Sequence, residues 1–281
     1  MVYIMFQYKY KRKIRAILHK FNHPALVLWK TSEALVLLKG FSALNVNLES
    51  KIILEIGYGD GKFSSIVIPQ NNFIGLDISK DIIMEAKRNV KENLGLIVSD
   101  ARYLPFRSSS INIILSICTL EHIPELNKVL KECSIILKNG GLFIFTVPSN
   151  YFSRNLFFYN LAKHLHLNNI AKWYSNYRNR QLNHFHCYSI KLWKRILRLH
   201  KFKAIFYEYY LSKFLTEIWD LLAFIHYILK KFSLLINLRL MSSNKLRIPY
   251  LESFYYYILK RFWTTRERTG SGLIIFAMKN E

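Results

Sequence analysis

The stretch 51–63, KIILEIGYGDGKF, places Gly57, Gly59 and Gly61 directly after a short run of branched apolar residues. A continuous apolar run of this length is typical of a strand buried on both faces of a sheet. Glycine inside a helix or strand lowers stability, so a cluster marks a tight turn or a backbone that a ligand approaches closely. Strand, glycine turn and helix, in this order, predict a nucleotide site.

Strand and helix patterns alternate through the rest of the chain, which predicts a mostly parallel sheet with helices on both faces. We expect strands at 51–57, 72–79, 94–101, 111–119, 141–149, 203–211 and 272–280, and helices at 60–68, 79–94, 124–137 and 189–200. Ser79 is expected to cap the second of these helices, and Asn139–Gly141 to end the third. Residues 150–185 show no clear period.

The chain divides by composition into three parts. Residues 1–50 predict a basic helical arm, amphipathic and broken at Pro24; residues 51–211 and 271–281 predict the α/β core; residues 212–270 form an apolar and basic insertion. The net charge is +23, and the balances over 1–50, 51–150 and 151–281 are +6, +1 and +16. The core is therefore neutral, and its basic flanks are suited to an anionic partner, either a membrane surface or nucleic acid. Lysine-rich coding bias is the alternative explanation.

The cysteines and the N-terminus favour a cytoplasmic protein. Three cysteines, an odd number without metal-ligand spacing, favour a reducing compartment. At the N-terminus the apolar residues precede the basic ones, the reverse of the order in a secretory signal.

Acidic residues follow the strand ends at the spacing that a nucleoside ligand requires. Ligands of open parallel sheets bind beyond the carboxyl ends of the strands. Asp77 lies 20 residues after Gly57, where a carboxylate can accept both ribose hydroxyls. Asp100 ends the third strand, where its carboxylate or the next amide can meet adenine. Glu55 precedes the glycines, where a dinucleotide-binding protein needs no acid.

Five ordered motifs within 51–150 resemble the class I S-adenosylmethionine-dependent methyltransferases of the type 11 family. They are EIGYGDG, GLDIS, SDARYLPF, ICTLEHI and LKNGGLFIFTVPS. The resemblance implies a Rossmann-like methyltransferase fold with a seven-stranded, mostly parallel sheet and an antiparallel last strand. It also implies that S-adenosylmethionine is the cofactor. The cofactor-binding residues that it implies are Glu55, Gly57, Gly59, Gly61, Asp77, Ile78, Asp100 and Ala101.

Two histidines are candidates for the chemistry. His122, at the end of the fourth strand, could remove a proton from a hydroxyl acceptor, or it could pack or contact cofactor. His184, in the segment NHFHCYS, is expected at the rim of the acceptor pocket. No second cluster completes a metal site, so no metal is expected.

We expect methylation of a small or lipid-linked acceptor, on a hydroxyl oxygen, at the cytoplasmic membrane face. RNA methylation by way of the basic flanks is the alternative, and a non-catalytic binding module is disfavoured because every cofactor acid is present. The longest uncharged run of the insertion, 221–229, has nine residues, too few to span a bilayer. Three interpretations of the insertion stay open: a lid over the acceptor, a helix in the membrane interface, or a dimer surface.

Overall fold

The computed structural model describes residues 12–69, 71–90, 95–235 and 268–280. The predictions for residues 1–11 and for the second aromatic and basic stretch of the insertion, 252–267, lie outside this part of the chain.

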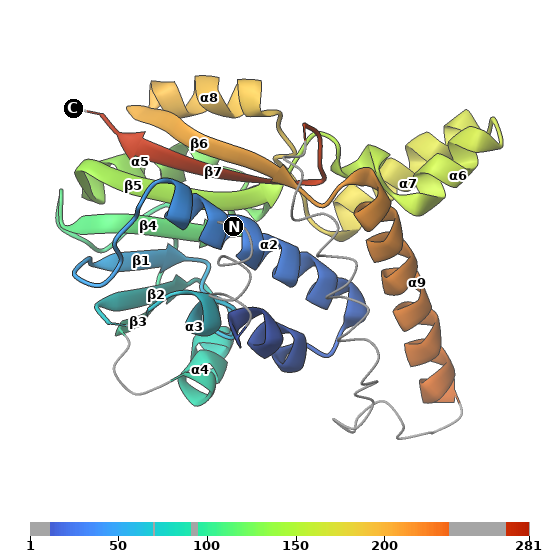
Figure 1. Cartoon of the computed structure of the whole chain (residues 1–281), viewed down its shortest axis with the longest axis horizontal. Coiled ribbons are helices and arrows are strands. Elements are labelled where there is room, and N and C mark those ends of the chain that lie inside the picture. The colour runs from blue at the N-terminus through green and yellow to red at the C-terminus, as the bar shows by residue number, and fades with distance from the viewer. Residues whose placement is uncertain (1–11, 70, 91–94, 236–267, 281) are drawn as a thin grey trace, which may run out of the picture.

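The fold is a seven-stranded sheet in the order β3-β2-β1-β4-β5-β7-β6 (Figure 1). Its strands are β1 (Ile53–Ile56), β2 (Phe73–Asp77), β3 (Gly95–Val98), β4 (Ile111–Ile117), β5 (Leu137–Pro148), β6 (Phe202–Tyr210) and β7 (Gly272–Lys279). The pairs from β3 to β5 are parallel, and β7 runs antiparallel to both β5 and β6. The predicted Rossmann-like methyltransferase sheet with an antiparallel last strand is confirmed.

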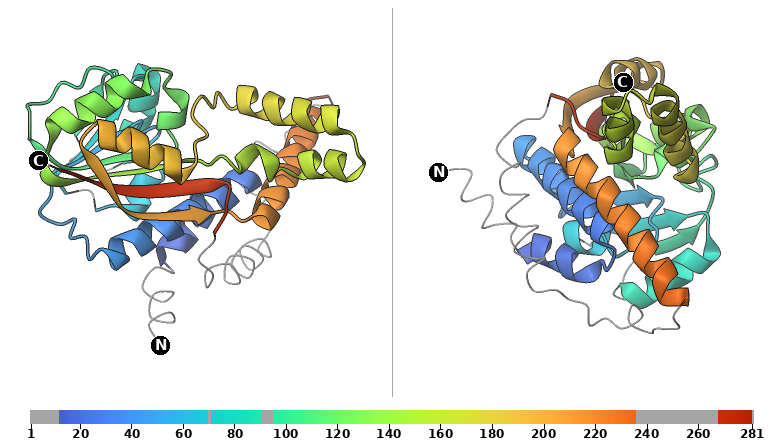
Figure 2. Two further views of the ribbon diagram at one scale, coloured as in Figure 1. Left: turned by 90° about the horizontal axis from the view of Figure 1, so that it is seen from above. Right: turned by 90° about the vertical axis from the view of Figure 1, so that its right-hand side faces the viewer.

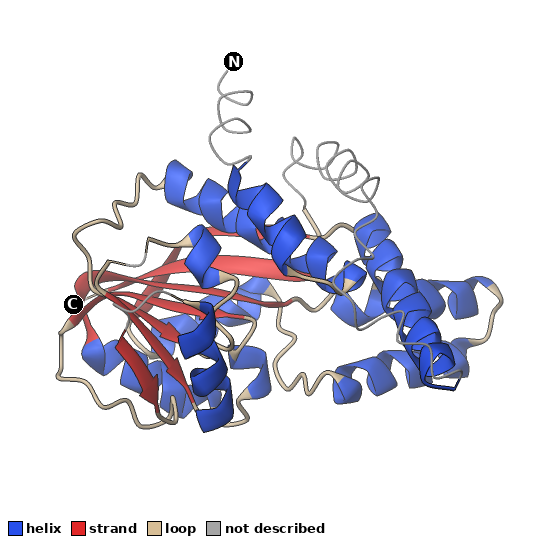
Figure 3. Cartoon of the chain, turned by 90° about the horizontal axis from the view of Figure 1, so that it is seen from below, coloured by secondary structure: helices blue, strands red, loops and turns tan. Residues whose placement is uncertain are grey.

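Alternate residues of the strands enter two different cores, because successive side chains of a strand point to opposite faces. Ile53 belongs to the core on one face, and its neighbours Leu54 and Ile56 belong to the core on the other. The helices of the first face are α2 (Pro24–Ala43), α3 (Ser64–Val67) and α4 (Lys80–Asn89); those of the second are α5 (Leu126–Ile136) and α8 (Ile190–Leu199). Figure 3 shows helices on both sides of the strands.

Helix α2 differs from the expected amphipathic arm. It begins at Pro24, at the predicted break, and Leu28 and Leu37 are fully buried within it. It contacts β6 and β7 of the sheet and also a second long helix, α9 (Lys213–Leu235). Because it is covered from more than one side, α2 is apolar around most of its circumference. The prediction of a one-sided helix was wrong for this half of the arm.

The end of α5 also differs from the prediction. The helix ends at Ile136, and β5 begins at Leu137 without a turn. Asn139–Gly141 lies within β5, where the pairing with β4 passes from Ile111–Leu137 directly to Ile113–Leu142. Gly140 has a φ of 72° in this irregular stretch. The glycines therefore serve a bulge in the strand and not a helix cap. Ser79 caps α4 as predicted, accepting from the Ile82 N–H at 3.3 Å.

Helices fill the segment that has no sequence period. They are η2 (Phe152–Arg154), α6 (Phe157–His164) and α7 (Asn168–Gln181). With α9, the helices α6 and α7 extend away from the sheet on the side where its parallel strands end (Figure 2). Helix α6 contacts both α7 and α9. Helix α7 is polar on most faces, so tertiary contacts determine it more than any apolar period.

Candidate active site

The glycine turn follows β1 and leaves one side of its backbone open. Gly57 has a φ of 72°, and a Cβ added there would lie 2.2 Å from the Thr119 side chain. Gly57 therefore lets the turn pack against the segment after β4. Gly59 has a φ of 60°, and a Cβ added there would meet nothing within 4 Å. The turn thus presents exposed backbone, as expected where a ligand approaches closely.

Asp77 connects the end of β2 to this turn. Its Oδ2 accepts a hydrogen bond from the Gly59 N–H at 3.0 Å, and its Oδ1 accepts one from the Ser79 N–H at 3.0 Å. A carboxylate has about four acceptor sites, so both oxygens can still accept from a ribose. Ile78, the next residue, is 67% exposed beside them and offers an apolar surface to a flat ring.

Asp100 has a partner that the sequence did not indicate. The Arg102 guanidinium donates from Nε to both of its oxygens and from Nη2 to Oδ2 at 2.6 Å. Arg102 also bonds Glu125, so one arginine links two acids. Its hydrogen bonds lower the pKa of Asp100. The Asp100 carboxylate is therefore occupied by Arg102, and Ala101, the next residue, is buried.

Glu55 is buried in the sheet beneath the turn. Burial raises its pKa to about 8, and a hydrogen bond with Ser64 and the nearby charge of Lys30 oppose that rise. Its Oε2 has no hydrogen-bond partner among the described residues. An unpartnered buried carboxyl oxygen can accept a hydrogen bond from a ligand donor such as an ammonium group. The residues at the strand ends therefore fit a cofactor that is both a nucleoside and a cation.

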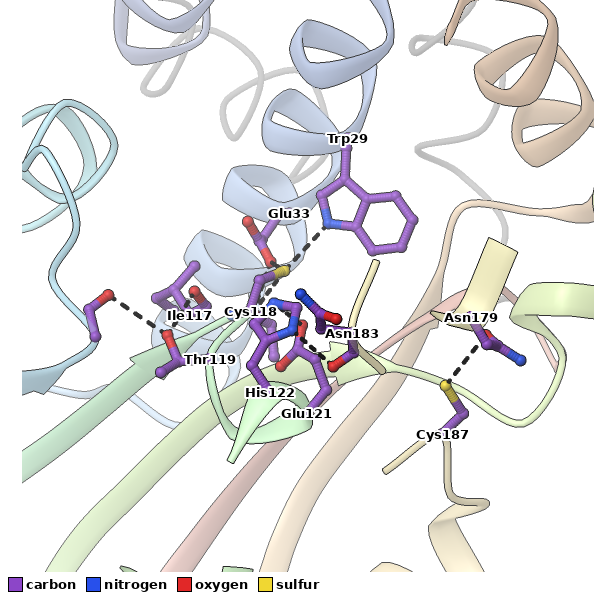
Figure 4. A network of polar contacts seen from close by, with 12 residues as sticks. Trp29, Glu33, Ile117, Cys118, Thr119, Glu121, His122, Asn179, Asn183 and Cys187 are labelled. Carbon is purple, nitrogen blue, oxygen red and sulfur yellow. Dashed lines mark hydrogen bonds and ion pairs between the residues drawn. The ribbon is translucent and has the colours of Figure 1, made fainter. Parts of the chain in front are cut away.

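His122 lies beyond β4, in the short helix η1 (Leu120–His122). Its Nδ1 lies 3.1 Å from the carbonyl oxygen of Asn183 (Figure 4). Because a carbonyl oxygen can only accept, Nδ1 carries the proton and Nε2 keeps its lone pair. Glu121 Oε1 lies 3.8 Å from Nε2. The ring is thus oriented with its basic nitrogen available.

The loop at 183–186 is attached to η1 by two further hydrogen bonds. The Phe185 N–H donates to the Glu121 carbonyl at 2.8 Å, and His186 Nε2 donates to the Ile123 carbonyl at 2.8 Å. These contacts bring His184 beside His122, with ring centroids 5.6 Å apart. The two histidines, 62 residues apart in sequence, therefore lie side by side in the fold.

His184 is not suited to accept a proton. Burial, followed by the charges of His122 and Arg178, lowers its pKa to about 4. Its ring packs edge-on against Phe152 at 5.1 Å. A group with this pKa is neutral at pH 7 and a weak base, so packing is the role that its surroundings support.

Helix α2 contributes side chains that the sequence did not assign to the site. Glu33 Oε1 accepts from Cys118 Sγ at 2.9 Å, and the Trp29 indole N–H lies 3.3 Å from the same sulfur (Figure 4). Lys30 pairs with Glu33. The available signal was a Lys and a Glu three residues apart inside a mostly apolar helix, since charges are buried only when they are paired.

A second unpredicted group connects the helices beyond the strand ends. Asp220 of α9 is 1% exposed and accepts from the Tyr174 hydroxyl at 2.8 Å. Arg178 Nε lies 3.4 Å from the same carboxylate, and its guanidinium lies 5.1 Å from the Trp219 ring. This group fixes α7 to α9 above the histidines. Within the described residues, no three His, Cys, Asp or Glu side chains gather at a metal-binding distance.

Comparisons with known proteins agree with this geometry. Residues 54–145 match the methyltransferase domain family. An uncharacterized protein of Methanocaldococcus jannaschii is 35% identical over 37% of this chain and 39% of its own length. The ubiquinone biosynthesis O-methyltransferase of Coxiella burnetii is 28% identical over 38% of this chain and 47% of its own length. The chain thus spans less than half the length of either relative.

A solved structure shares the fold over most of the chain. The Haemonchus contortus phosphoethanolamine N-methyltransferase 2, in complex with S-adenosyl-L-methionine, has a TM-score of 0.52 at 17% identity and covers 89% of this chain and 52% of its own. Residues 54–145 are therefore a class I methyltransferase domain, and S-adenosylmethionine is the cofactor of that class.

Proposed function

We propose that this protein is an S-adenosylmethionine-dependent methyltransferase that methylates a hydroxyl oxygen on a small or lipid-linked acceptor. The observation that carries the proposal is the orientation of His122, with Nδ1–H bonded to the Asn183 carbonyl and Nε2 available. A base is required when the acceptor is a hydroxyl, and an imidazole held in this tautomer supplies one.

The side chains have distinct roles in this reaction. When bound, the cofactor supplies a methyl group on a sulfonium that is already activated for in-line displacement. Asp77 and the open backbone of Gly59 would hold its nucleoside, and the buried carboxyl of Glu55 would face its cationic part. His122 Nε2 removes the hydroxyl proton. Glu121 Oε1 lies 3.8 Å from this nitrogen, and because burial raises the pKa of Glu121 to about 8, its side chain lines the site as a mostly neutral carboxyl.

Hydroxyl acceptors are also what the similarity to a ubiquinone biosynthesis O-methyltransferase supports. The surroundings of His122 suit an acceptor with apolar surface, because the neighbouring His184 ring packs on Phe152, which in turn contacts Trp219. We propose that the chain forms a core, 51–211 and 271–281, to which the arm and the 212–270 insertion add the acceptor side.

The surface of α9 supports a lipid-linked acceptor at a membrane face. Ile225, Ile228 and Leu229 are 50%, 46% and 49% exposed, and Lys230 follows them. Apolar residues bordered by lysine suit a helix lying in the membrane interface. No helix in the described part of the chain has the length and apolarity to cross a bilayer.

Nucleic acid is less well supported. A cavity of about 480 Å³ is lined by Lys128, Lys131, His200 and Lys201 and is suited to an anion. It lies at the start of β6, next to Lys279 at the end of β7, and so at the amino edge of the parallel strands. The glycine turn lies at the opposite edge. An RNA bound in this cavity would therefore lie at the edge of the sheet opposite to His122, and its binding there would not bring a base to that residue.

Label transfer tests the proposal. The protein is incubated with methyl-labelled S-adenosylmethionine and either a lipid extract, a panel of small phenols, amines and carboxylic acids, or bulk RNA. We expect label in the organic phase or on phenols, in a bond that resists alkali. Label on RNA alone would support the alternative. Cofactor binding with transfer to none of these acceptors would leave a binding module and contradict the proposal.

A further inference from the structure

Helix α2 holds a buried ion pair near the carboxyl ends of β4, β5 and β6, although it lies outside the segment that matches the methyltransferase domain. Glu33 is fully buried, and its Oε1 accepts from Thr146 Oγ1 at 2.6 Å and from the Tyr210 hydroxyl at 3.1 Å. Its Oε2 lies 2.7 Å from Lys30 Nζ. Glu33 is therefore fixed by several donors, and it fixes the lysine in turn.

Lys30 extends toward the cofactor side of this pair. Its Nζ lies 4.8 Å from the ring centroid of Phe63, two residues after the last glycine of the turn. An ammonium has three donors, and Glu33 accepts the one hydrogen bond that Lys30 makes with the described residues. The side chain is 15% exposed. A mostly buried ammonium with spare donors can bind an anionic group.

Two carboxyl groups near Lys30 also have unused hydrogen-bonding capacity. Glu55 and Glu121 are 2% and 1% exposed, and the Oε2 atom of each has no partner among the described residues. The charge of Lys30 acts on both of them. One cation beside two acids is complementary to an α-amino acid, whose carboxylate needs a donor and whose ammonium needs acceptors.

We propose that Lys30 binds the α-carboxylate of the methionine part of S-adenosylmethionine, with Glu33 as the residue that positions the lysine. This inference rests on the proposed function, because it takes S-adenosylmethionine as the ligand. It makes the N-terminal helix part of the cofactor site. The alternative is that Lys30 only neutralises Glu33.

Calorimetry with two ligands separates the alternatives. S-Adenosylmethionine and its decarboxylated analogue share the sulfonium, the amine and the nucleoside, and differ only in the carboxylate. One charge-assisted hydrogen bond corresponds to about 10- to 100-fold in affinity. We expect the wild type to prefer S-adenosylmethionine by about this factor. Lys30→Met should lose the preference while its affinity for the analogue changes little, and Lys30→Arg should retain the preference.

Lys39→Met is the matched control, since Lys39 also lies on α2 and pairs with a buried glutamate, Glu208 of β6. It should leave the preference unchanged. If Lys30→Met does not fold, as thermal melting would show, Lys30→Met with Glu33→Gln replaces it and leaves no unpaired charge. Equal loss of both ligands in the Lys30 variant overturns the inference. Failure of the wild type to bind either ligand overturns the cofactor assignment as well.

Discussion

The methyltransferase domain at 54–145 and the helices added to it contribute to the same site by different physical means. The domain presents the ends of neighbouring strands of one sheet. There Asp77, at the end of β2, accepts a hydrogen bond from the Gly59 N–H in the turn after β1. The added helices contribute single side chains that are far away in sequence from their partners. Glu33, for example, precedes its hydrogen-bond partner Thr146 by 113 residues. The strand ends of the domain are therefore held by contacts between neighbouring segments of one sheet, and the added helices are held to them by contacts between residues far apart in sequence.

The two neighbouring histidines give the largest expected difference between these regions. His122 belongs to the domain and keeps a free Nε2, whereas His184 belongs to the added loop and has a pKa of about 4. His122→Asn should lower turnover by about 10²- to 10⁴-fold with cofactor affinity nearly kept. His184→Asn should lower it far less. Single-turnover rates and calorimetry measure the two effects, and the reverse order would place the base in the loop.

Asp77 tests whether the strand ends of the domain hold the cofactor. Asp77→Ala removes an acceptor of two ribose hydroxyls and should weaken S-adenosylmethionine binding by roughly 100-fold or more. Because this carboxylate also holds the Gly59 N–H, Asp77→Asn is the companion variant that keeps one oxygen at the turn. Calorimetry and thermal melting would be run together. Equal affinities, or a preference for a nicotinamide nucleotide, would contradict the cofactor assignment.

Helix α9 tests what the added region does at a surface. The variant with Ile225, Ile228 and Leu229 changed to serine should lose about tenfold or more in binding to anionic liposomes, even at high salt, because half-exposed apolar groups no longer leave water. Leu222 is not changed, since it packs against the core. Leu192 and Leu199 of α8, changed to serine, are the control.

Liposome flotation at low and high salt measures this binding, beside a filter assay with bulk RNA. The membrane interpretation would be contradicted if the protein floats with no liposomes but retains RNA on the filter. Such RNA binding would fall steeply with salt and would be the same in the serine variant.

The smallest expected effect concerns the pH dependence of stability. Burial raises the pKa of Glu121 to about 8, above that of the unfolded chain, so the folded state holds a proton that the unfolded state releases. This stabilisation is complete at low pH and is lost as pH rises toward 8. Between pH 6 and 7, where the unfolded carboxyl is ionised and the folded one is still mostly protonated, Glu121→Gln should flatten the fall in unfolding free energy by up to about 1.4 kcal/mol per pH unit.

Denaturant titrations of cofactor-free protein would measure that slope. Glu85→Gln is a suitable control, because Glu85 lies on the exposed side of α4. A slope identical in the wild type and in Glu121→Gln would show that Glu121 is ionised in the folded protein.

Local sequence was sufficient for the sheet and for the strand-end residues. The apolar runs, the glycine turn and the acids after the strands each depend on a few consecutive residues, and the order of parallel strands then brings Asp77 beside Gly59. The cap at Ser79 was predicted for the same reason, since its hydrogen bond reaches only to Ile82.

Only the tertiary structure decided the rest of the site. The helices α6 and α7 were not predicted from the sequence, and contacts with each other and between α6 and α9 stabilise them. The sequence indicated only that Lys30 and Glu33 belong to a basic arm, whereas packing buries them near the carboxyl ends of the strands. The sequence predicted that the Asp100 carboxylate is available to adenine, whereas the structure shows that it accepts hydrogen bonds from Arg102. In each case the residue contacts a partner on another element, or a partner whose position depends on the fold of a loop. The spacing of residues along the sequence does not indicate such contacts.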